Sequence, residues 1–434
     1  MYKRIITFIP KPIKNQLKKV ITFYINKTLS KKMRVKHQEL LTEIKNKDKI
    51  KVVFLVIQHS VWKVDSVFKR MQNDPFFDPV ILICPYISNG EENMIHDLNA
   101  AYNFFKTKNY PVVSSLINNG TSLNWLKLKE LQPDLIFFTN PHKLTRPEYH
   151  SEAYLNYLTC YVPYHHEVVS CSRNLDQYNQ VIHNGLWRIF APHQCSKDAY
   201  NKYCTSKDGN VLVTGYPSCE DLYNKTIVDV WKYQEKTKLK IIWAPHHTID
   251  NDRIPYSNFL QYADLFTDLI KKTKDHVQWV FKPHPMLKYN LYSHSDWGEN
   301  RTEQYYNFWH ENENTQLEEG EYAPLFQQSD ALIHDSGSFL AEYLYLKKPV
   351  LFTARTENYK DYYNDFGLCA LSSIKVAKEW EEVLQFVNAL IDGENGITRE
   401  HYHFIEKNIE PFFNGTTPSK LIVDSIKHEL KSEK

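Results

Sequence analysis

Three apolar runs in the second half of the chain each end in polar residues that could bind an anion. They read "WAPHHT" (243–248), "VFKPHP" (280–285) and "IHDSGS" (333–338). Histidine titrates near neutral pH and can donate to an oxyanion or move a proton. If the runs are parallel strands, their carboxyl ends share one edge of a sheet, where ligands bind in open α/β folds. The sequence therefore predicts an anion site at this edge.

The small loop after the third run suits a phosphate or diphosphate. A helix that begins after it has free backbone N–H groups, and Gly337 has no side chain to keep an anion away. Asp335 can cap the helix, and Glu342, two turns along, could accept from a sugar-like hydroxyl. An ordinary helix cap and an exposed glutamate fit the same residues. The predicted nucleotide-binding residues are His246, His247, Arg253, Lys282, Asp335, Ser336, Gly337, Ser338 and Glu342.

His284 is the predicted catalytic residue at this edge, because a proline on each side fixes its backbone. In the first half of the chain, "YVPYHHEV" (161–168) and "VIHNGLW" (181–187) also place histidines beside turn-forming residues. His165, His166 and His183 are alternatives for a base that takes a proton from an acceptor hydroxyl. Each of the three also fits a structural role.

We expect neither a metal nor a cofactor other than the donor nucleotide. Adjacent residues such as His246 and His247 point apart on an extended chain, and no carboxylate-rich partner spacing accompanies them. The seven cysteines form no CxxC pair, and their odd number argues against a disulfide framework. Buried free thiols are typical of a reducing cytoplasm.

The apolar runs alternate with stretches of helical length, which indicates parallel sheets covered by helices. Expected strands lie at 51–57, 79–84, 134–139, 187–192 and 210–217, and again at 239–245, 277–285, 331–335 and 349–353. Expected helices lie between them, near 60–73, 90–108, 122–132, 256–273, 322–329 and 337–347, and residues 376–430 have a helical pattern. The prediction is an α/β protein with two doubly wound units: a segment 1–48, a first domain 49–217 and a second domain 218–434.

Positive charge is concentrated at the amino terminus. Residues 1–38 contain eleven Lys or Arg and no acid, which leaves 42 basic and 51 acidic residues, a net charge of −9, for the rest. The apolar residues of this segment are too interrupted for a spanning helix or a secretory signal. A basic amphipathic helix on an anionic membrane surface and a solvated tail are the two alternatives. The acidic body argues against a nucleic-acid partner.

Taken together and in order, "VTGYP", "WAPHHT", "KPHP" and "SDALIHDSGSFLAEYLYLKKPVLF" resemble the CDP-glycerol glycerophosphotransferase family of teichoic-acid polymerases and primases. The resemblance implies a GT-B-like fold, with two Rossmann-like domains facing a cleft, peripheral to the inner face of the cell membrane. It implies that His284 and Ser336 to Ser338 contact the donor and that a first-domain histidine is the base. The chain departs from the family's "HG" motif and from its Asp-Tyr-Ser-Ser loop. "DSGS" also resembles the non-hydrolysing UDP-sugar 2-epimerases.

The resulting hypothesis is a transferase that moves glycerol phosphate, or a similar alditol phosphate, from a CDP-linked donor to a hydroxyl of a lipid-linked or surface glycan. The alternative is a GT-B glycosyltransferase that uses a nucleotide sugar in capsule or lipopolysaccharide synthesis. A membrane-bound scaffold with a degenerate nucleotide site is a third, non-enzymatic possibility.

Overall fold

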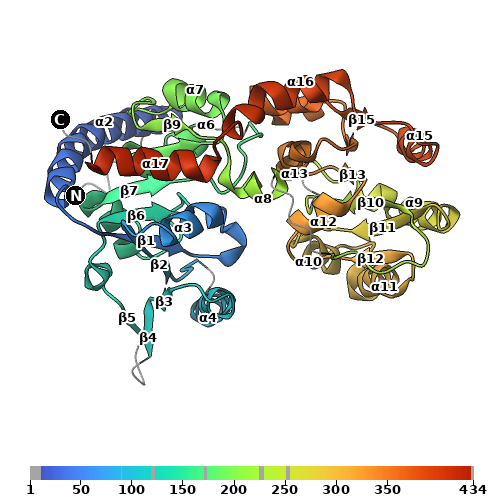
Figure 1. The fold of residues 1–434 in the computed structure, drawn as a ribbon, viewed down its shortest axis with the longest axis horizontal. Helices are drawn as coiled ribbons and strands as arrows, with labels where there is room; N and C mark the ends of the chain where they lie inside the picture. Colours follow the sequence, from blue (N-terminus) through green and yellow to red (C-terminus); the bar gives the residue numbers. More distant parts are fainter. Residues whose placement is uncertain are drawn as a thin grey trace. The chain divides into compact units, whose positions relative to one another are not determined.

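A computed structural model describes residues 11–88, 90–118, 123–170, 174–223, 229–250 and 255–431. The chain forms two compact units (Figure 1). The first contains residues 1–165, 173–218 and 416–434, and the second contains residues 166–172 and 219–415. The chain therefore passes from one unit to the other four times. Arg253, a predicted nucleotide-binding residue, lies outside the described residues.

The first unit is built on a seven-stranded parallel sheet in the order β3-β2-β1-β6-β7-β8-β9. The central strand β1 is an apolar run that is buried along nearly its whole length, as expected of a strand covered on both faces. The strands of this sheet are β1 (Ile50–Val56), β2 (Phe77–Ile83), β3 (Val112–Ser114), β6 (Leu135–Phe138), β7 (Leu158–Tyr161), β8 (Arg188–Ala191) and β9 (Val211–Val213). A separate antiparallel pair joins β4 (Leu116–Asn118) and β5 (Leu123–Trp125).

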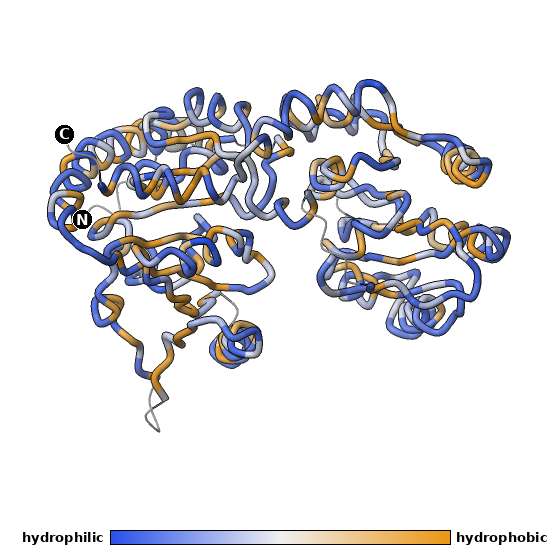
Figure 2. The backbone as a smooth tube through the Cα atoms, viewed as in Figure 1, coloured by the Kyte–Doolittle hydropathy of each residue, from blue (hydrophilic) through white to orange (hydrophobic). Residues whose placement is uncertain are grey.

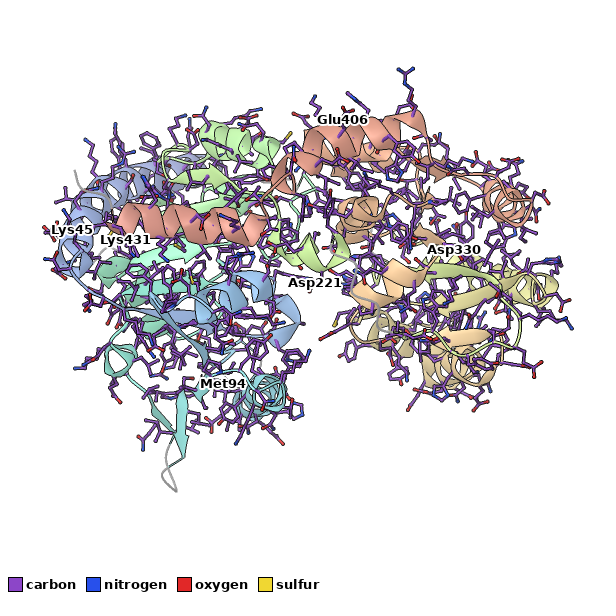
Figure 3. The ribbon with its side chains drawn as sticks, viewed as in Figure 1. Lys45, Met94, Asp221, Asp330, Glu406 and Lys431 are labelled. Carbon is purple, nitrogen blue, oxygen red and sulfur yellow. The ribbon has the colours of Figure 1, made fainter. Side chains whose placement is uncertain are left out.

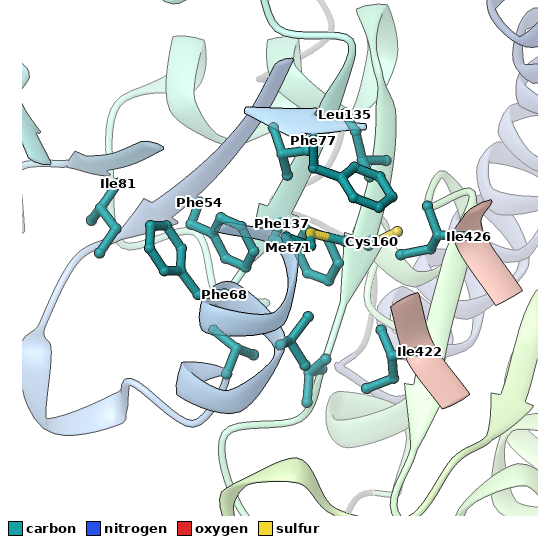
Figure 4. Packing of buried hydrophobic residues seen from close by; sticks show 14 of the residues in the cluster. Phe54, Phe68, Met71, Phe77, Ile81, Leu135, Phe137, Cys160, Ile422 and Ile426 are labelled. Atoms are coloured by element: carbon teal, nitrogen blue, oxygen red, sulfur yellow. The ribbon is translucent and has the colours of Figure 1, made fainter. Parts of the chain in front are cut away.

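Helices cover this sheet and complete its core (Figure 4). Phe54 of β1 stacks on Phe137 of β6 with ring centroids 4.6 Å apart. Ile422 and Ile426, from the last helix of the chain, belong to the same buried cluster. The helices are α2 (Lys11–Ile44), α3 (Asp65–Gln72), α4 (Glu91–Thr107), α5 (Ser151–Asn156), α6 (Asn174–Tyr178), α7 (Gln194–Tyr203) and α17 (Pro418–Lys431). The terminal helix, which the sequence-based division assigns to the second domain, thus packs in the first unit.

The second unit is built on a six-stranded parallel sheet in the order β12-β11-β10-β13-β14-β15. Figure 2 shows the hydrophobic stretches along the strands of both sheets. Trp243 of β10 stacks on Phe266 of α9, with ring centroids 4.0 Å apart, at the centre of an aromatic core. The strands are β10 (Leu239–Ala244), β11 (Val277–Phe281), β12 (Thr315–Leu317), β13 (Ala331–His334), β14 (Val350–Thr353) and β15 (Lys375–Ala377). The helices are α8 (Glu220–Tyr223), α9 (Phe259–Lys272), α10 (Leu287–Tyr292), α11 (Gly298–Glu311), α12 (Ala323–Gln328), α13 (Gly337–Glu342), α14 (Asp365–Ser372), α15 (Trp380–Ile391) and α16 (Arg399–Asn408).

In both sheets, an aspartate lies just before the strand that follows the reversal of strand order, and it accepts a hydrogen bond from the backbone of the central strand. In the first unit, Asp134 accepts a hydrogen bond from the backbone N–H of Lys51 at 2.9 Å. In the second unit, Asp330, which is labelled in Figure 3, accepts a hydrogen bond from the backbone N–H of Lys240 at 2.8 Å. Each aspartate fastens the amino end of its strand to the central strand. Both units therefore have the Rossmann-like strand order and the same fastening at its turning point.

The predicted strands are found close to their expected positions, but six short strands among the described residues were missed. They are β3, β4, β5, β7, β12 and β15, each of three or four residues. Of residues 122–132, expected to be a helix, Leu123–Trp125 form strand β5 and Leu128–Leu131 form a single 3-10 turn. The helix expected at 337–347 is also shorter, because α13 ends at Glu342 and a 3-10 turn continues to Leu346.

Helix α2 has two different faces. Asn26, Ser30, Met33, His37 and Ile44 are buried against the first unit. On the opposite side, Leu17, Val20, Ile21, Tyr24, Ile25 and Val35 are each between 48% and 63% exposed. Their spacing is that of one apolar stripe along a helix. None of the described helices combines the length and apolar character needed to cross a bilayer.

Candidate active site at the switch point of the second sheet

The order of the second sheet reverses between β10 and β13, which are direct neighbours. In open parallel sheets, the carboxyl ends of the strands at such a reversal form the usual ligand site. His246 and His247 follow β10, His284 follows the adjacent strand β11, and Asp335 follows β13. The structure therefore brings the three predicted strand ends to one edge of one sheet.

Asp335 joins two of these loops. Its carboxylate accepts hydrogen bonds from the backbone N–H of His246 at 2.5 Å and from that of Asn258, before α9, at 2.8 Å. Burial raises the pKa of Asp335 to about 7, against the opposite effect of these bonds. Asp335 was expected to cap the following helix, but the N-cap position belongs to Ser336. The carboxylate instead fixes the position of the loop that carries His246.

Three imidazole rings, those of His246, His247 and His284, form what we call the imidazole cluster. Their ring centroids are 4.2 to 4.9 Å apart. One ring nitrogen of each histidine lies within 4.8 Å of one from each of the others. Burial, followed by the neighbouring imidazoles, lowers the pKa of His246 to about 2. Burial, His247 and Lys282 lower the pKa of His284 to about 3, so these rings are neutral at pH 7.

The hydrogen bonds of the cluster indicate which ring nitrogens carry protons. The backbone N–H of Met286 donates to Nδ1 of His284 at 3.1 Å, so this nitrogen has a lone pair and the neutral ring carries its proton on Nε2. The side-chain amide of Asn290 donates to the carbonyl oxygen of His247 at 2.9 Å and lies 3.4 Å from its Nδ1, which gives His247 the same tautomer. Two imidazole N–H groups are thus available as donors.

This tautomer pattern fits an anion better than a metal ion. The proximity of three imidazoles would also suit a transition metal, which binds the unprotonated nitrogen of a neutral ring. In His247 and His284 the unprotonated nitrogen already accepts a hydrogen bond from the protein. The remaining N–H groups match the oxygens of a phosphate, which accept hydrogen bonds.

The Ser336 to Ser338 loop lies on the same edge, with Ser336 buried and Ser338 exposed. Helix α13 after it contains only six residues. A β-carbon on Gly337 would lie 3.1 Å from Cγ1 of Val169. The side of Gly337 that lacks a side chain therefore faces Val169. The sequence predicted that an anion would approach the backbone here, and in the structure the Val169 side chain takes this position.

Two other predicted residues are engaged within the second unit. Glu342 is buried and accepts a hydrogen bond from the hydroxyl of Tyr322. Lys282 is buried next to the cluster, and its backbone N–H donates to Trp243 at 2.8 Å. Sequence reasoning missed Arg355, which follows β14 and donates to the backbone carbonyls of Thr248 at 3.2 Å and Ile249 at 2.6 Å. Its position directly after a strand was the available signal.

The histidines of the motif "YHHEV" fall in different units. His165 is in the first unit, where burial lowers its pKa to about 4. His166 belongs to a strap, residues 166–170, that packs in the second unit. Its ring stacks on Phe366 with centroids 5.3 Å apart, and Nε2 lies 3.0 Å from the hydroxyl of Tyr345. The sequence predicted that His166 lies in the first domain, but in the structure it belongs to the second unit.

His183 is completely buried in the first unit, with Nδ1 accepting from the backbone N–H of Gln180 at 3.2 Å. Burial lowers its pKa to about 3. A residue that the sequence analysis did not select, His142, follows β6 and lies 3.2 Å from the hydroxyl of Tyr164, directly before His165. The rule that strand ends carry chemistry, applied to the first half of the chain, would have found it.

Comparisons with known proteins agree with this geometry. A model of the family described as CDP-Glycerol:Poly(glycerophosphate) glycerophosphotransferase matches residues 163–416. No curated protein matches the sequence. Among solved structures, a variant of the wall teichoic acid polymerase TagF is 13–14% identical, with a TM-score of 0.54–0.55 over 96% of this chain and 98% of that one.

Two other solved structures are similar in the same way. MnaA of S. aureus with UDP has a TM-score of 0.54 and 16% identity, over 88% of this chain and 97% of that chain. UDP-GlcNAc 2-epimerase from Neisseria meningitidis bound to UDP-GlcNAc has a TM-score of 0.52 and 17% identity, over 87% and 99%. These similarities confirm the predicted fold class, with two Rossmann-like units of the GT-B type.

Proposed function

Since the chain belongs to the CDP-glycerol:poly(glycerophosphate) glycerophosphotransferase family, we propose that it transfers glycerol phosphate, or a similar alditol phosphate, from a CDP-linked donor. The proposed acceptor is a hydroxyl of a lipid-linked or surface glycan. The observation that carries the proposal is the imidazole cluster at the switch point of the second sheet, with two N–H donors.

The proposed role of the cluster is to bind the donor's diphosphate. His247 and His284 donate Nε2–H to its oxygens, and the charge of Lys282, adjacent to the cluster in sequence, compensates part of the anionic charge. Hydrogen bonds aimed at phosphate oxygens stabilise charge as it develops on the leaving group, which is the usual contribution of a protein to phosphoryl transfer. A bound dianion also raises the pKa of these rings, because its negative charge stabilises the protonated form. Protonation of the cluster would then strengthen the interaction.

The proposed reaction forms one bond and breaks one. The acceptor's hydroxyl oxygen attacks the phosphorus that carries the alditol. The bond from this phosphorus to the oxygen shared with CMP breaks, and CMP leaves with the electron pair. We assign the acceptor's proton to His165. Burial lowers its pKa to about 4, so the ring is neutral at pH 7 but a weak base, and a nearby bound anion would have to raise this pKa for the ring to hold the proton. His183 is buried and bonded, and His166 is held between Tyr345 and Phe366.

The proposed location is the inner face of the cell membrane. The exposed apolar stripe of α2 and the basic residues that flank it suit an anionic bilayer surface. The described cysteines form no disulfide bond with one another, which fits a reducing compartment.

The test is release of CMP from CDP-glycerol by purified protein with a glycan acceptor. We expect His284→Gln to lower kcat by about 100-fold or more, the usual effect of removing one donor from developing charge. His276→Gln is the matched control, because His276 is exposed at the opposite end of strand β11. Equal activity of both variants would refute the role of His284. Stabilisation by UDP- or GDP-sugars in preference to CDP-glycerol or CDP-ribitol would favour the glycosyltransferase alternative.

A further inference from the structure

A cavity lies in the first unit, between α2 and the body of that unit. Its volume is about 740 Å³, within the range of ordinary small-molecule sites. One wall is the carboxyl-terminal half of α2, from Ser30 to Lys45. The opposite wall comes from residues 184–188 and 206–210 and from Glu429 of α17 (Figure 3 labels Lys45 and Lys431 near these two helix ends). The cavity is separate from the residues assigned above to the donor and the base.

The charge of this cavity is positive. Its lining contains three cations, Arg34, Lys45 and Arg188, and one carboxylate, Glu429. Arg188 is neutralised by Glu429, since its Nε donates to Oε1 at 2.6 Å. Arg34 extends from α2 toward the other wall, where a β-carbon on Gly209 would lie 3.9 Å from its Nη2. The remaining charge of +2 suits a phosphate group.

Two buried acceptors in the lining have no hydrogen-bond partner among the described residues, Nε2 of His37 and Oδ1 of Asn210. His37 is 6% exposed. Its ring forms a hydrogen bond with the backbone of Gly185 that raises its pKa, as a bond donated by the ring does, so Nε2 holds a lone pair. The amide nitrogen of Asn210 donates to the carbonyl of Leu186 at 2.9 Å, which fixes the side-chain orientation. Both acceptors can take a hydrogen bond from an O–H or N–H group that reaches them.

A ligand that satisfies both requirements carries a phosphate and several hydroxyl groups. The position of the exposed lining residues indicates the source of this ligand. Eighteen residues make five full turns of an α-helix, so Gln38 and Thr42 lie on the same face as Val20 and Tyr24 of the apolar stripe. Gln38 and Thr42 are exposed and line the cavity, and exposed Val35 continues the stripe to this level. The exposed residues Gln38 and Thr42 of the lining thus lie on the side of α2 that carries the stripe.

We propose that this cavity binds the headgroup of a membrane lipid whose phosphate is esterified to a polyol, as in phosphatidylglycerol. Arg34 binds the phosphate, and the polyol hydroxyls donate to His37 and Asn210. The site would hold the protein on membranes that contain this headgroup and would position α2 at the bilayer surface. This inference does not depend on the proposed transfer reaction, because none of its residues takes part in it.

The test is calorimetric titration of the full-length protein with dihexanoyl-phosphatidylglycerol below its micelle concentration. Dihexanoyl-phosphatidylcholine, dihexanoyl-phosphatidic acid and free glycerol phosphate are the comparison ligands. We expect phosphatidylglycerol to bind about tenfold tighter than each of them. Arg34→Gln should weaken this binding by about tenfold, the effect of one charge-assisted hydrogen bond. Arg34 is exposed, so its substitution should not affect folding.

Lys32→Gln is the matched control, because Lys32 is exposed on the same helix, is absent from the cavity lining and carries the same charge. His37→Leu removes one buried acceptor and should abolish the preference for phosphatidylglycerol over phosphatidic acid. Absence of binding at millimolar lipid, or equal losses in Arg34→Gln and Lys32→Gln, would overturn the proposal. Equal affinity for free glycerol phosphate would overturn the assignment to a lipid and identify a site for a soluble polyol phosphate.

Discussion

Two glycines of the second unit face the strap (residues 166–170), and adding the same methyl group to each should have very different effects. A β-carbon on Gly367 would lie 2.2 Å from the carbonyl oxygen of Val168, a backbone atom, and 3.0 Å from the ring of Tyr363. A β-carbon on Gly337 would lie 3.1 Å from the end of the Val169 side chain. Only the first contact requires the backbone of the strap to move, by about 1 Å if a normal contact is to be restored.

The cost of that movement follows from the hydrogen bonds of the strap. The backbone N–H of Asn364 donates to Val168 at 3.1 Å, and that of Ser170 donates to Tyr362 at 2.8 Å. Losing both costs about 2 kcal/mol, and overpacking adds about 1–3 kcal/mol. A gain of about 1 kcal/mol from replacing glycine inside helix α14 offsets part of this. Gly367→Ala should therefore destabilise the second unit by about 2–4 kcal/mol.

The measurement is urea denaturation followed by tryptophan fluorescence, supported by thermal unfolding. For a unit of this size, the expected loss corresponds to a decrease in Tm of about 5–15 °C. Gly337→Ala is the matched control, and it should change the free energy of unfolding by less than about 1 kcal/mol because a side-chain methyl can rotate away. If the two variants were equally stable, the strap would not be packed as described and the geometric argument would fail.

Three further predictions concern the site and α2. Because the pKa values of His246 and His284 are lowered, the unfolded chain binds more protons than the folded protein below pH 6.5. The free energy of unfolding should therefore fall by about 1–2 kcal/mol per histidine between pH 7 and pH 5, and the raised pKa of Asp335 should offset part of this loss. Urea denaturation at the two pH values measures the change, and constant stability would contradict the prediction. Asp335→Asn should lower the free energy of unfolding, measured by urea denaturation, by about 1–3 kcal/mol, because one of the two backbone N–H groups that donate to Asp335 loses its acceptor. Asp330→Asn, at the exposed end of the same strand, should lower it by less than about 1 kcal/mol. Similar losses in the two variants would argue against a special role for Asp335. Ile21→Glu should reduce co-sedimentation of the protein with anionic vesicles by about tenfold. Tyr233→Glu, at an exposed side chain of the second unit, should have no effect. Unchanged vesicle binding by Ile21→Glu would exclude the stripe as the membrane contact.

The architecture was largely predictable because strands buried on both faces are continuous apolar runs. Those of β1, β10 and β13 stand out in the sequence, and their alternation with helices fixes the fold class. The edge strands β3, β12 and β15 were not predictable, since their residues are only partly buried and carry too little apolar pattern, as in Lys375–Ala377. The meeting of the strand ends followed from the parallel sheet alone.

The detailed roles of the site residues could not be obtained in this way. Nothing in the sequence indicates that Asp335 accepts from Asn258, or that Gly337 makes room for Val169, because both contacts join segments far apart in the chain. The tautomer of His284 depends on a hydrogen bond from the backbone of Met286, which exists only once the loop has folded. The sequence identifies the residue types, and the contacts decide their chemistry.

The return of α17 to the first unit affects how the protein can be made. The first hydrophobic core includes Ile422, Val423, Ile426 and Leu430, which are synthesised after the whole second unit. Between Cys219 and Gly415 the chain belongs to the second unit. During translation the second unit can therefore fold while the first still lacks α17. Loss of α17 would leave an open apolar surface in the first unit and an intact second unit.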